Sequence, residues 1–230
     1  MKHSFLIFIL FVSITACTDK DNESNKRTSY EKGIELAAAG KFNKAQKAFT
    51  QALQDEEDKD TARQSLEVVN KILSQELQSK AATDFFKGIQ FNNNGELLLA
   101  FNYFSNAIRT APDFSTAYYE RGIVNGRLNK FDRAVEDFSR VIELDPDDVF
   151  AYNNRGLARA RGLKKYNEAI ADFTKAVELD PQFAGAYDNR GIAYQMAGAD
   201  KGKACADWKK ACDLNRCNSY NLARKNSYCQ

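Results

Sequence analysis

The side chains that most often carry acid–base or metal chemistry are scarce in this sequence. Its 230 residues include a single histidine, His3, which precedes a short apolar run near the N-terminus. We expect that run to be removed, and the mature chain would then contain no histidine. Without imidazole there is no Ser-His-Asp or Cys-His nucleophile pair and no histidine-ligated zinc. No carboxylate pair stands out either, so we expect no enzyme, no cofactor and no metal site.

Cysteine is the other reactive residue type, and it is concentrated at one end. Four cysteines lie in the last 26 residues: Cys205, Cys212, Cys217 and Cys229. Cys205 and Cys212 are seven residues apart on one expected helix, which separates them by about 10 Å. A disulfide spans at most about 7 Å between Cα atoms. Two connectivities therefore remain open, Cys205–Cys217 with Cys212–Cys229, or Cys205–Cys229 with Cys212–Cys217. No Cys-x-x-Cys spacing occurs, which favours disulfides over zinc.

The fifth cysteine, Cys17, ends a segment with the features of an export signal. Lys2 is followed by an apolar run over 5–12, which is too short for a bilayer that takes about 20 apolar residues. A basic start, a short apolar core and a small-residue exit are typical of a secretory signal. Residues 14–17, Ile-Thr-Ala-Cys, resemble the bacterial lipobox. The resemblance implies a signal peptide over 1–16 and lipidation of Cys17; an ordinary secretory signal is the alternative.

The lipoprotein resemblance also implies a location. Residues 17–28 are polar and charged, so we expect them to form a disordered tether. No aspartate follows Cys17 directly, and in lipoprotein families its absence favours the outer membrane. We therefore expect a lipid-anchored protein of the cell envelope, on the periplasmic or the surface face.

The elements that position these residues follow a repeat. Glycines recur at intervals of 34, 34 and 35 residues, at Gly88, Gly122, Gly156 and Gly191. The only prolines keep the same intervals, at Pro112, Pro146 and Pro181. We place the extra residue of the longer interval in a loop at 162–165. An aromatic residue follows Gly33 and each of these four glycines by 16 or 17 residues, at Phe49, Phe104, Phe138, Phe173 and Trp208. A period of this length indicates a helical solenoid.

The pattern resembles the tetratricopeptide repeat (TPR), over about 26–59 and 81–217, most clearly in "AYYERGIVNGRLNKFDRAVEDFSRVIELDPDD". The resemblance implies an all-α solenoid of about five helix-turn-helix repeats. We expect the first repeat at 29–59, an extra helix at 60–80, four repeats at 81–217 and a C-terminal cap at 218–230. Whether the extra helix runs on into the next one is open. Asn125 and Arg159 replace a typical aromatic residue, so we expect looser packing there.

In TPR proteins the first helix of each pair lines a concave groove that binds peptide. The implied groove residues are Tyr119, Glu120, Arg127, Asn153, Asn154, Arg161, Asp188 and Asn189. Asn154 and Asn189 resemble the asparagine ladder of some TPR superhelices, where an amide both donates to and accepts from a peptide backbone. The alternative is a solvated polar face. The lysine and asparagine of the carboxylate-clamp variety are missing, so we expect no chaperone tail as ligand.

Charged residues also recur, one directly before each glycine and one directly before each aromatic residue, in the last three repeats. Arginines precede the glycines at Arg121, Arg155 and Arg190, and aspartates precede the aromatic residues at Asp137, Asp172 and Asp207. Because both signs recur in step, we expect ion pairs between helices rather than an anion-binding row.

These observations predict a membrane-tethered adaptor or scaffold that binds a protein or extended peptide in its concave groove. The alternative is a structural subunit of an envelope assembly or secretion complex that uses its convex face or its ends. A net charge of +2 gives no electrostatic case for nucleic acid, and we expect no small-molecule substrate.

Overall fold

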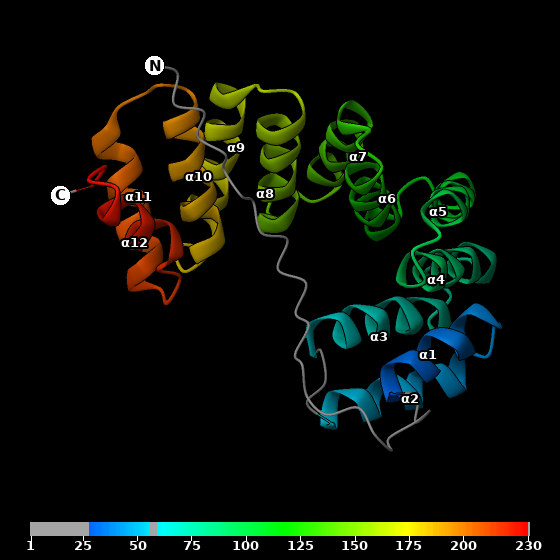
Figure 1. The fold of residues 1–230 in the computed structure, drawn as a ribbon. Helices are drawn as coiled ribbons and strands as arrows, with labels where there is room; N and C mark the ends of the chain where they lie inside the picture. The colour runs from blue at the N-terminus through cyan, green and yellow to red at the C-terminus, as the bar shows by residue number, and fades with distance from the viewer. Residues whose placement is uncertain (1–27, 56–58, 230) are drawn as a thin grey trace.

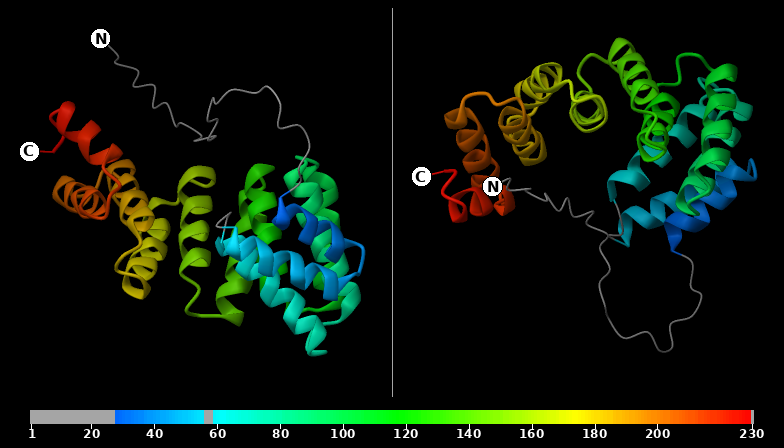
Figure 2. Two further views of the ribbon diagram at one scale, coloured as in Figure 1. Left: turned by 90° about the horizontal axis from the view of Figure 1, so that it is seen from below. Right: turned by 45° about the horizontal axis from the view of Figure 1, so that its top comes forward.

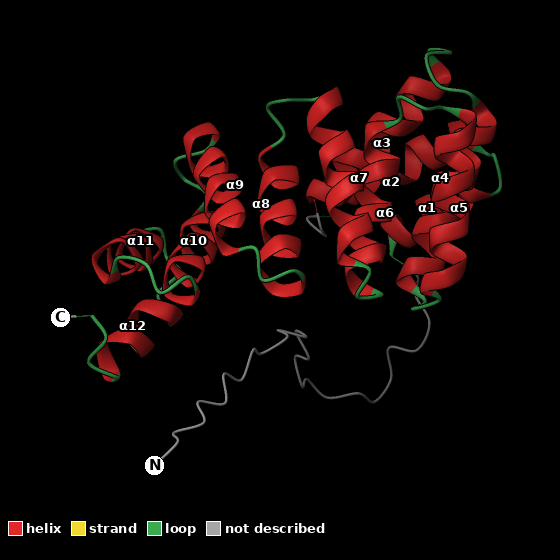
Figure 3. Ribbon diagram, turned by 90° about the horizontal axis from the view of Figure 1, so that it is seen from above, coloured by secondary structure: helices red, strands yellow, loops and turns green. Residues whose placement is uncertain are grey.

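The computed structural model describes residues 28–55 and 59–229. Within those ranges all regular secondary structure is helical, and loops join the helices (Figure 3). No helix in them is both long and apolar enough to cross a membrane. The expected signal peptide, Cys17 and the tether up to residue 27 lie outside the described residues.

The helices form an arc of antiparallel pairs (Figures 1 and 2). Their bounds are α1 Ser29–Ala38, α2 Phe42–Gln54, α3 Lys59–Leu73, α4 Ser79–Asn93, α5 Leu97–Thr110, α6 Ser115–Arg127, α7 Phe131–Leu144, α8 Val149–Leu157, η1 Ala158–Gly162, α9 Tyr166–Leu179, α10 Ala184–Met196, α11 Lys201–Asp213 and α12 Asn218–Lys225. Five pairs, α1/α2, α4/α5, α6/α7, α8/α9 and α10/α11, pack in sequence. The predicted all-α solenoid with an extra helix and a cap is confirmed.

The repeated glycines let the two helices of each pair approach closely. A Cβ on Gly88 would lie 2.6 Å from the Phe104 ring, and one on Gly191 would lie 2.5 Å from the Trp208 indole. The other three pairs show the same contact between glycine and aromatic ring. Any side chain would have to displace a buried ring, so glycine is required for packing even though it costs about 1 kcal/mol inside a helix.

Helix α1 begins at Ser29, the first residue of the expected first repeat, and its cap uses the last residue of the expected tether. Thr28, which we assigned to the tether, is instead the N-cap of α1. Its hydroxyl accepts from the backbone N–H of Glu31, and Glu31 reaches back to the N–H of Thr28. This reciprocal capping box satisfies two backbone donors that a helix start leaves unpaired.

The extra helix α3 does not continue into α4. The chain turns over residues 74–78, where Gln75 has a φ of 65°. α3 packs mainly against α2, while α1 packs directly against α4. The rings of Phe49 on α2 and Phe86 on α4 stack with centroids 5.8 Å apart. The first pair therefore packs directly on the second pair, and α3 packs against the side of the first pair.

The extra residue of the longer interval lies in a helix rather than in the predicted loop at 162–165. α8 ends in the wider π-helical turn η1, which takes up one residue without breaking the rod. A Cβ on Gly162 would lie 1.9 Å from the Phe131 ring. The widened turn thus places this backbone directly on α7, where only glycine fits.

Candidate functional site

In the last three pairs, the recurring arginine binds the aspartate of its own pair and also reaches the pair before it. Arg121 on α6 donates to both carboxylate oxygens of Asp137 on α7, at 2.6–3.2 Å, and to the Ser105 hydroxyl on α5 at 3.2 Å. Arg155 binds Asp172 and Ser139 in the same way, and Arg190 binds Asp207 and Thr174. The expected ion pairs are confirmed, and each guanidinium joins three helices.

Each of these arginines also lies over a tyrosine ring one turn earlier. The centroids of Tyr118, Tyr152 and Tyr187 are each 5.5 Å from the guanidinium carbon of their arginine. Cation–π contact of this kind favours a desolvated guanidinium. The three arginines therefore serve internal packing, and the row offers no free cations to an anionic ligand.

Asn125 and Arg159, the two departures from the repeat pattern, bind the same aspartates as the recurring arginines. Asn125, only 1% exposed, donates its amide to Oδ2 of Asp137 at 2.8 Å. Arg159 donates to Oδ2 of Asp172 at 2.6 Å. Our expectation of looser packing at these positions is wrong. At both positions the polar side chain that replaces the aromatic residue is hydrogen-bonded to the facing aspartate, as buried polar groups generally are.

The first helices α6, α8 and α10 present a shared surface, which we call the inner face. Its central residues precede the glycines by two or three positions, at Tyr119, Glu120, Asn153, Asn154, Asp188 and Asn189. In Figure 1, α6 and α8 lie nearer the hollow of the arc than α7 and α9. These are the groove residues implied by the sequence, and the structure brings them together on neighbouring helices.

Hydrogen bonds along the inner face already engage both proposed ladder amides. Asn154 donates to the Tyr119 hydroxyl at 2.7 Å, which links α8 to α6. Asn189 donates to the side-chain oxygen of Asn153 at 2.9 Å, which links α10 to α8. One N–H of each amide is thus used within the chain. The amides hold first helices together, and only their remaining N–H and carbonyl groups can meet a ligand.

Asp188 lies at the C-terminal end of this row and is 7% exposed. Its backbone carbonyl accepts from the Trp208 indole N–H at 3.3 Å, and Oδ2 accepts from Nε of Arg216 at 3.0 Å. Oδ1 is buried without a hydrogen-bond partner. Asp188 therefore depends on Arg216, from the segment before α12, for its charge compensation.

Glu120 is the one carboxylate of the inner face without a partner. Its side chain is half-buried, and no hydrogen bond or ion pair holds it within the described part of the chain. Burial raises the pKa of Glu120 to about 7. Burial first, then the charges of Glu120 and Asp148, raise the pKa of Tyr119 well above its usual value. Both shifts arise from poor solvation of negative charge on this surface.

The two predicted groove arginines lie further along their helices and differ from each other. Arg127 donates to the carbonyl and to the side chain of Asn92, which ties α6 back to α4. Arg161 is exposed in η1. Arg161 follows Asn154 by seven residues, about 10 Å along a helix, so it stands at the far edge of the inner face.

Three exposed apolar residues on the same surface were not among the predicted groove residues. Phe150 on α8 is 55% exposed, and Ile192 and Met196 on α10 are 39% and 45% exposed. Phe150 precedes Asn154 by four residues, and Ile192 and Met196 follow Asn189 by three and seven. These spacings place all three on the inner face, and the same helical arithmetic applied to the sequence would have found them.

Comparisons with known proteins agree with this geometry. Residues 115–148 match the family model described as tetratricopeptide repeat, and residues 163–198 match the one described as TPR repeat. The solved structure "YrrB: a TPR protein with an unusual peptide-binding site" is 21% identical with a TM-score of 0.60, over 89% of this chain and 94% of that chain. "Crystal structure of MamA" is 21% identical with a TM-score of 0.58, over 80% and 94%. The chain has the fold of a TPR solenoid.

A third similar structure is "First TPR of Spaghetti (RPAP3) bound to HSP90 peptide SRMEEVD". It is 25% identical with a TM-score of 0.51, and it covers 54% of this chain and 98% of that chain. The structural match to TPR proteins thus extends over most of the solenoid, although the two family models match only two of its repeats.

The TPR solenoid ends in two disulfides. Cys205 on α11 pairs with Cys229, and Cys212 pairs with Cys217. The structure thereby selects one of the two connectivities that the spacing left open. All four thiols are used, so none remains to ligate zinc. The Cys212–Cys217 link closes the short loop that carries Arg216, and so it holds the partner of Asp188 in place.

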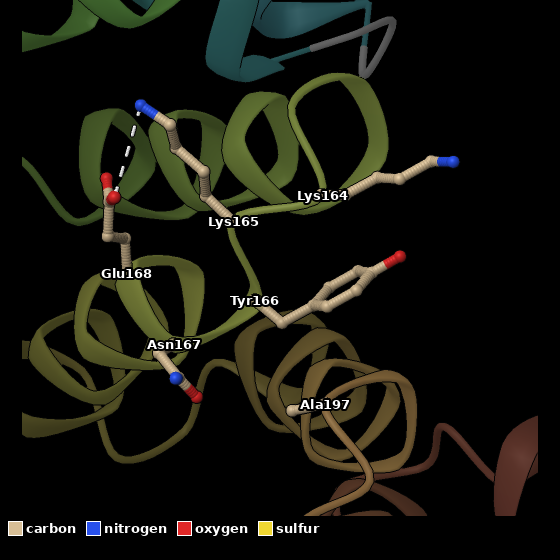
Figure 4. A pocket seen from close by; sticks show the side chains of 6 residues that line it. All are labelled: Lys164, Lys165, Tyr166, Asn167, Glu168 and Ala197. Carbon is tan, nitrogen blue, oxygen red and sulfur yellow. Dashed lines mark ion pairs between the residues drawn. The ribbon is translucent and has the colours of Figure 1, made fainter.

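The hollows of the TPR surface are shallow. One, of about 300 Å³, lies between the start of α9 and the end of α10 and is lined by Lys164, Lys165, Tyr166, Asn167, Glu168 and Ala197. Figure 4 shows Lys165 turned to Glu168, 4.0 Å away, while Lys164 points out. Another, of about 420 Å³, lies beside the exposed Leu98 and Leu99 at the start of α5. Neither gathers the converging polar groups of a small-molecule site.

Proposed function

We propose that this TPR solenoid is a non-catalytic adaptor or scaffold that binds a partner polypeptide on its inner face. The observation that carries the proposal is the set of unengaged groups on that face: Glu120 without a partner and Phe150, Ile192 and Met196 open to solvent. Exposed apolar side chains gathered on one surface are typical of interaction sites. YrrB has, by its description, a peptide-binding site, and the Spaghetti domain is bound to a peptide.

The inner face does not suit a C-terminal carboxylate. Positions that would hold a cation carry Tyr119, Asn153 and Asp188, and Glu120 stands among them. Like charges across an interface cost several kcal/mol. The ligand therefore differs in kind from the acidic peptide in the Spaghetti structure.

We further propose that a lipid on Cys17 tethers the solenoid to the cell envelope, most simply at the outer membrane. The support is the resemblance of residues 1–17 to lipoprotein signals. A tether raises the local concentration of whatever the inner face holds, because the second encounter becomes intramolecular. Partners are then proteins or extended peptides beside a membrane, with no role for nucleic acid or a small-molecule substrate.

Photo-crosslinking in the native cell tests the binding face. Ile192 is the best position for a photoreactive aromatic residue, because it is exposed and takes no part in the inner-face hydrogen bonds. Ala171, exposed on the second helix α9, is the matched control. A partner captured from Ile192 and not from Ala171 supports the adaptor. Capture from Ala171 alone contradicts it and supports a structural subunit of an envelope or secretion complex.

A separate experiment tests the tether. Cys17→Ser should move the protein out of the membrane fraction and abolish labelling with an alkyne palmitate analogue, while wild type retains both. Export with cleavage at the same place but no label in wild type would mean an ordinary secretory signal.

A further inference from the structure

The exposed apolar residues of the inner face belong to two adjacent helices. Ile192 and Met196 are one turn apart on α10, so they share a side of that helix. Phe150 begins α8, where its ring meets that of Phe183 edge-on with centroids 5.4 Å apart. Seven large hydrophobic residues are exposed over 28–55 and 59–229, and these are three of them. We call these three residues the apolar strip; they lie on two neighbouring helices of a face whose central residues are polar.

Among residues 28–55 and 59–229, no cation forms an ion pair with Glu120. The arginine beside it, Arg121, is fully engaged by Asp137 and Ser105. Arg127, two turns along α6, is bound to Asn92. On α8, Arg155 is bound to Asp172 and Ser139. A poorly solvated carboxylate of this kind gains most from a cation that arrives with a ligand.

The acid and the apolar strip are parts of one surface. The hydrogen bond from Asn154 to Tyr119 holds α8 against α6 next to Glu120. Phe150 lies one turn before Asn154 on the same side of α8. The hydrogen bond from Asn189 to Asn153 then joins α8 to α10, which carries Ile192 and Met196. A peptide lying across the three helices would meet the carboxylate first and the apolar side chains next.

We propose that the inner face binds a peptide segment in which large apolar side chains lie to one side of a lysine or arginine. The cation pairs with Glu120, and the apolar side chains cover Phe150, Ile192 and Met196. This inference rests on the proposed function and specifies the ligand class. An acidic segment would be repelled by Glu120 and would meet only the exposed Arg161 at the far edge.

Three peptide pools of matched length measure the preference. Each is a nine-residue pool with a fixed central residue, Lys, Glu or Gln, and with Leu or Phe fixed two positions to either side. A fourth pool has central Lys and Ser at the flanking positions. Each fluorescent pool is titrated with the full chain at low salt, and anisotropy gives the apparent affinity. We expect the Lys pool with apolar flanks to bind about tenfold or more tightly than the Glu pool.

Variants assign the preference to residues. Glu120→Lys should reverse the order of the Lys and Glu pools, and Glu120→Gln should make them equal. Glu178→Lys, the same charge change at an exposed position on α9, should leave the order as in wild type. Ile192→Ser should remove the difference between the apolar-flanked and Ser-flanked Lys pools. Circular dichroism of each variant verifies that the helices remain.

Two results overturn the inference. One is equal binding of the Lys and Glu pools by wild type, including the absence of any binding. The other is a Lys preference that survives Glu120→Gln. If crosslinking from Ile192 still captures a partner in the cell, only the ligand class is wrong and the adaptor stands. If that capture also fails, the binding face itself is wrong.

Discussion

The pair α4/α5 and the three pairs that follow it fill equivalent positions with different chemistry. Lys87 stands where the later pairs have arginine, Tyr103 where they have aspartate, and Phe91 where two of them have Asn125 and Arg159. Lys87 lies 5.6 Å from the Tyr103 centroid, and the rings of Phe91 and Tyr103 stack at 5.2 Å. An apolar and cation–π cluster in the first half thus replaces the ionic tie of the second.

The inner face differs between the two halves in the same way. Phe85 and Phe86 on α4 are buried, whereas the equivalent positions on α6 are Tyr119 and Glu120. The phenylalanines fill the space between the first and second pairs and leave little for a ligand to contact. The first half of the solenoid is therefore packed with apolar side chains, whereas the second half carries the polar face that we propose binds the partner.

The largest expected effect is in the apolar half. Phe86→Ala should lower the free energy of unfolding by about 3–5 kcal/mol, because a fully buried phenylalanine leaves a cavity. In a solenoid each repeat contacts only its neighbours, so hydrogen exchange should accelerate most in α1–α5. The exposed Phe150→Ala is the control and should change stability by less than about 0.5 kcal/mol. Uniform acceleration from α1 to α12 would mean that the halves unfold together.

The ionic half should be sensitive to the loss of one carboxylate. Asp172→Ala leaves Arg155 and Arg159 without their shared acceptor and should cost about 3 kcal/mol, since an uncompensated buried charge remains. Chemical denaturation followed by the single tryptophan, Trp208, measures this loss close to the affected pair. Glu178→Ala on the exposed side of α9 serves as control. A cost below about 1 kcal/mol would show that the ties contribute little and that packing alone holds both halves.

Much of this architecture could be predicted from the sequence because its signals are periodic. Glycine and aromatic residue recur together, and the two meet in all five pairs. Arginine and aspartate recur with the same period and at a nearly constant separation along the chain. Opposite charges in this arrangement indicate ion pairs. The error at Asn125 and Arg159 came from treating each position alone. Together with Asp137 and Asp172, these residues form a consistent polar set.

The features that the sequence did not reveal depend on contacts between repeats. The break between α3 and α4 contains neither glycine nor proline, and Gln75 adopts its positive φ without a local signal. The bond from Asn154 to Tyr119 spans 35 residues, so no local pattern could indicate that the amide is already engaged. The missing partner of Glu120 is likewise evident only once every nearby arginine has been assigned.

The disulfides extend the contrast, because among the described residues only the second half of the solenoid contains disulfides. Replacing Cys205 and Cys229 with serine removes a link across 24 residues and should cost the last pair about 2–3 kcal/mol. Trp208 lies 5.7 Å from the Tyr228 ring beside this link, so its fluorescence reports the change. Reductant opens both disulfides, so in wild type it should destabilise the last pair at least as much and leave hydrogen exchange in α4 and α5 unchanged. Equal acceleration in α4 and α5 would contradict local stabilisation.

The smallest expected effect concerns the boundary between the halves, at Glu120. Its folded pKa of about 7 exceeds the ordinary glutamate value of 4.5, so the folded state binds more protons than the unfolded state between those two pH values. Stability should therefore fall as pH rises from about 4.5 to 7. Because the side chain keeps some solvent access, the loss should be about 1–2 kcal/mol. Glu120→Gln should lack this portion of the pH dependence and should be more stable than wild type at pH 8. If the two profiles coincide, Glu120 is well solvated, and the inner face of the second half does not hold an uncompensated charge that a basic ligand could neutralise.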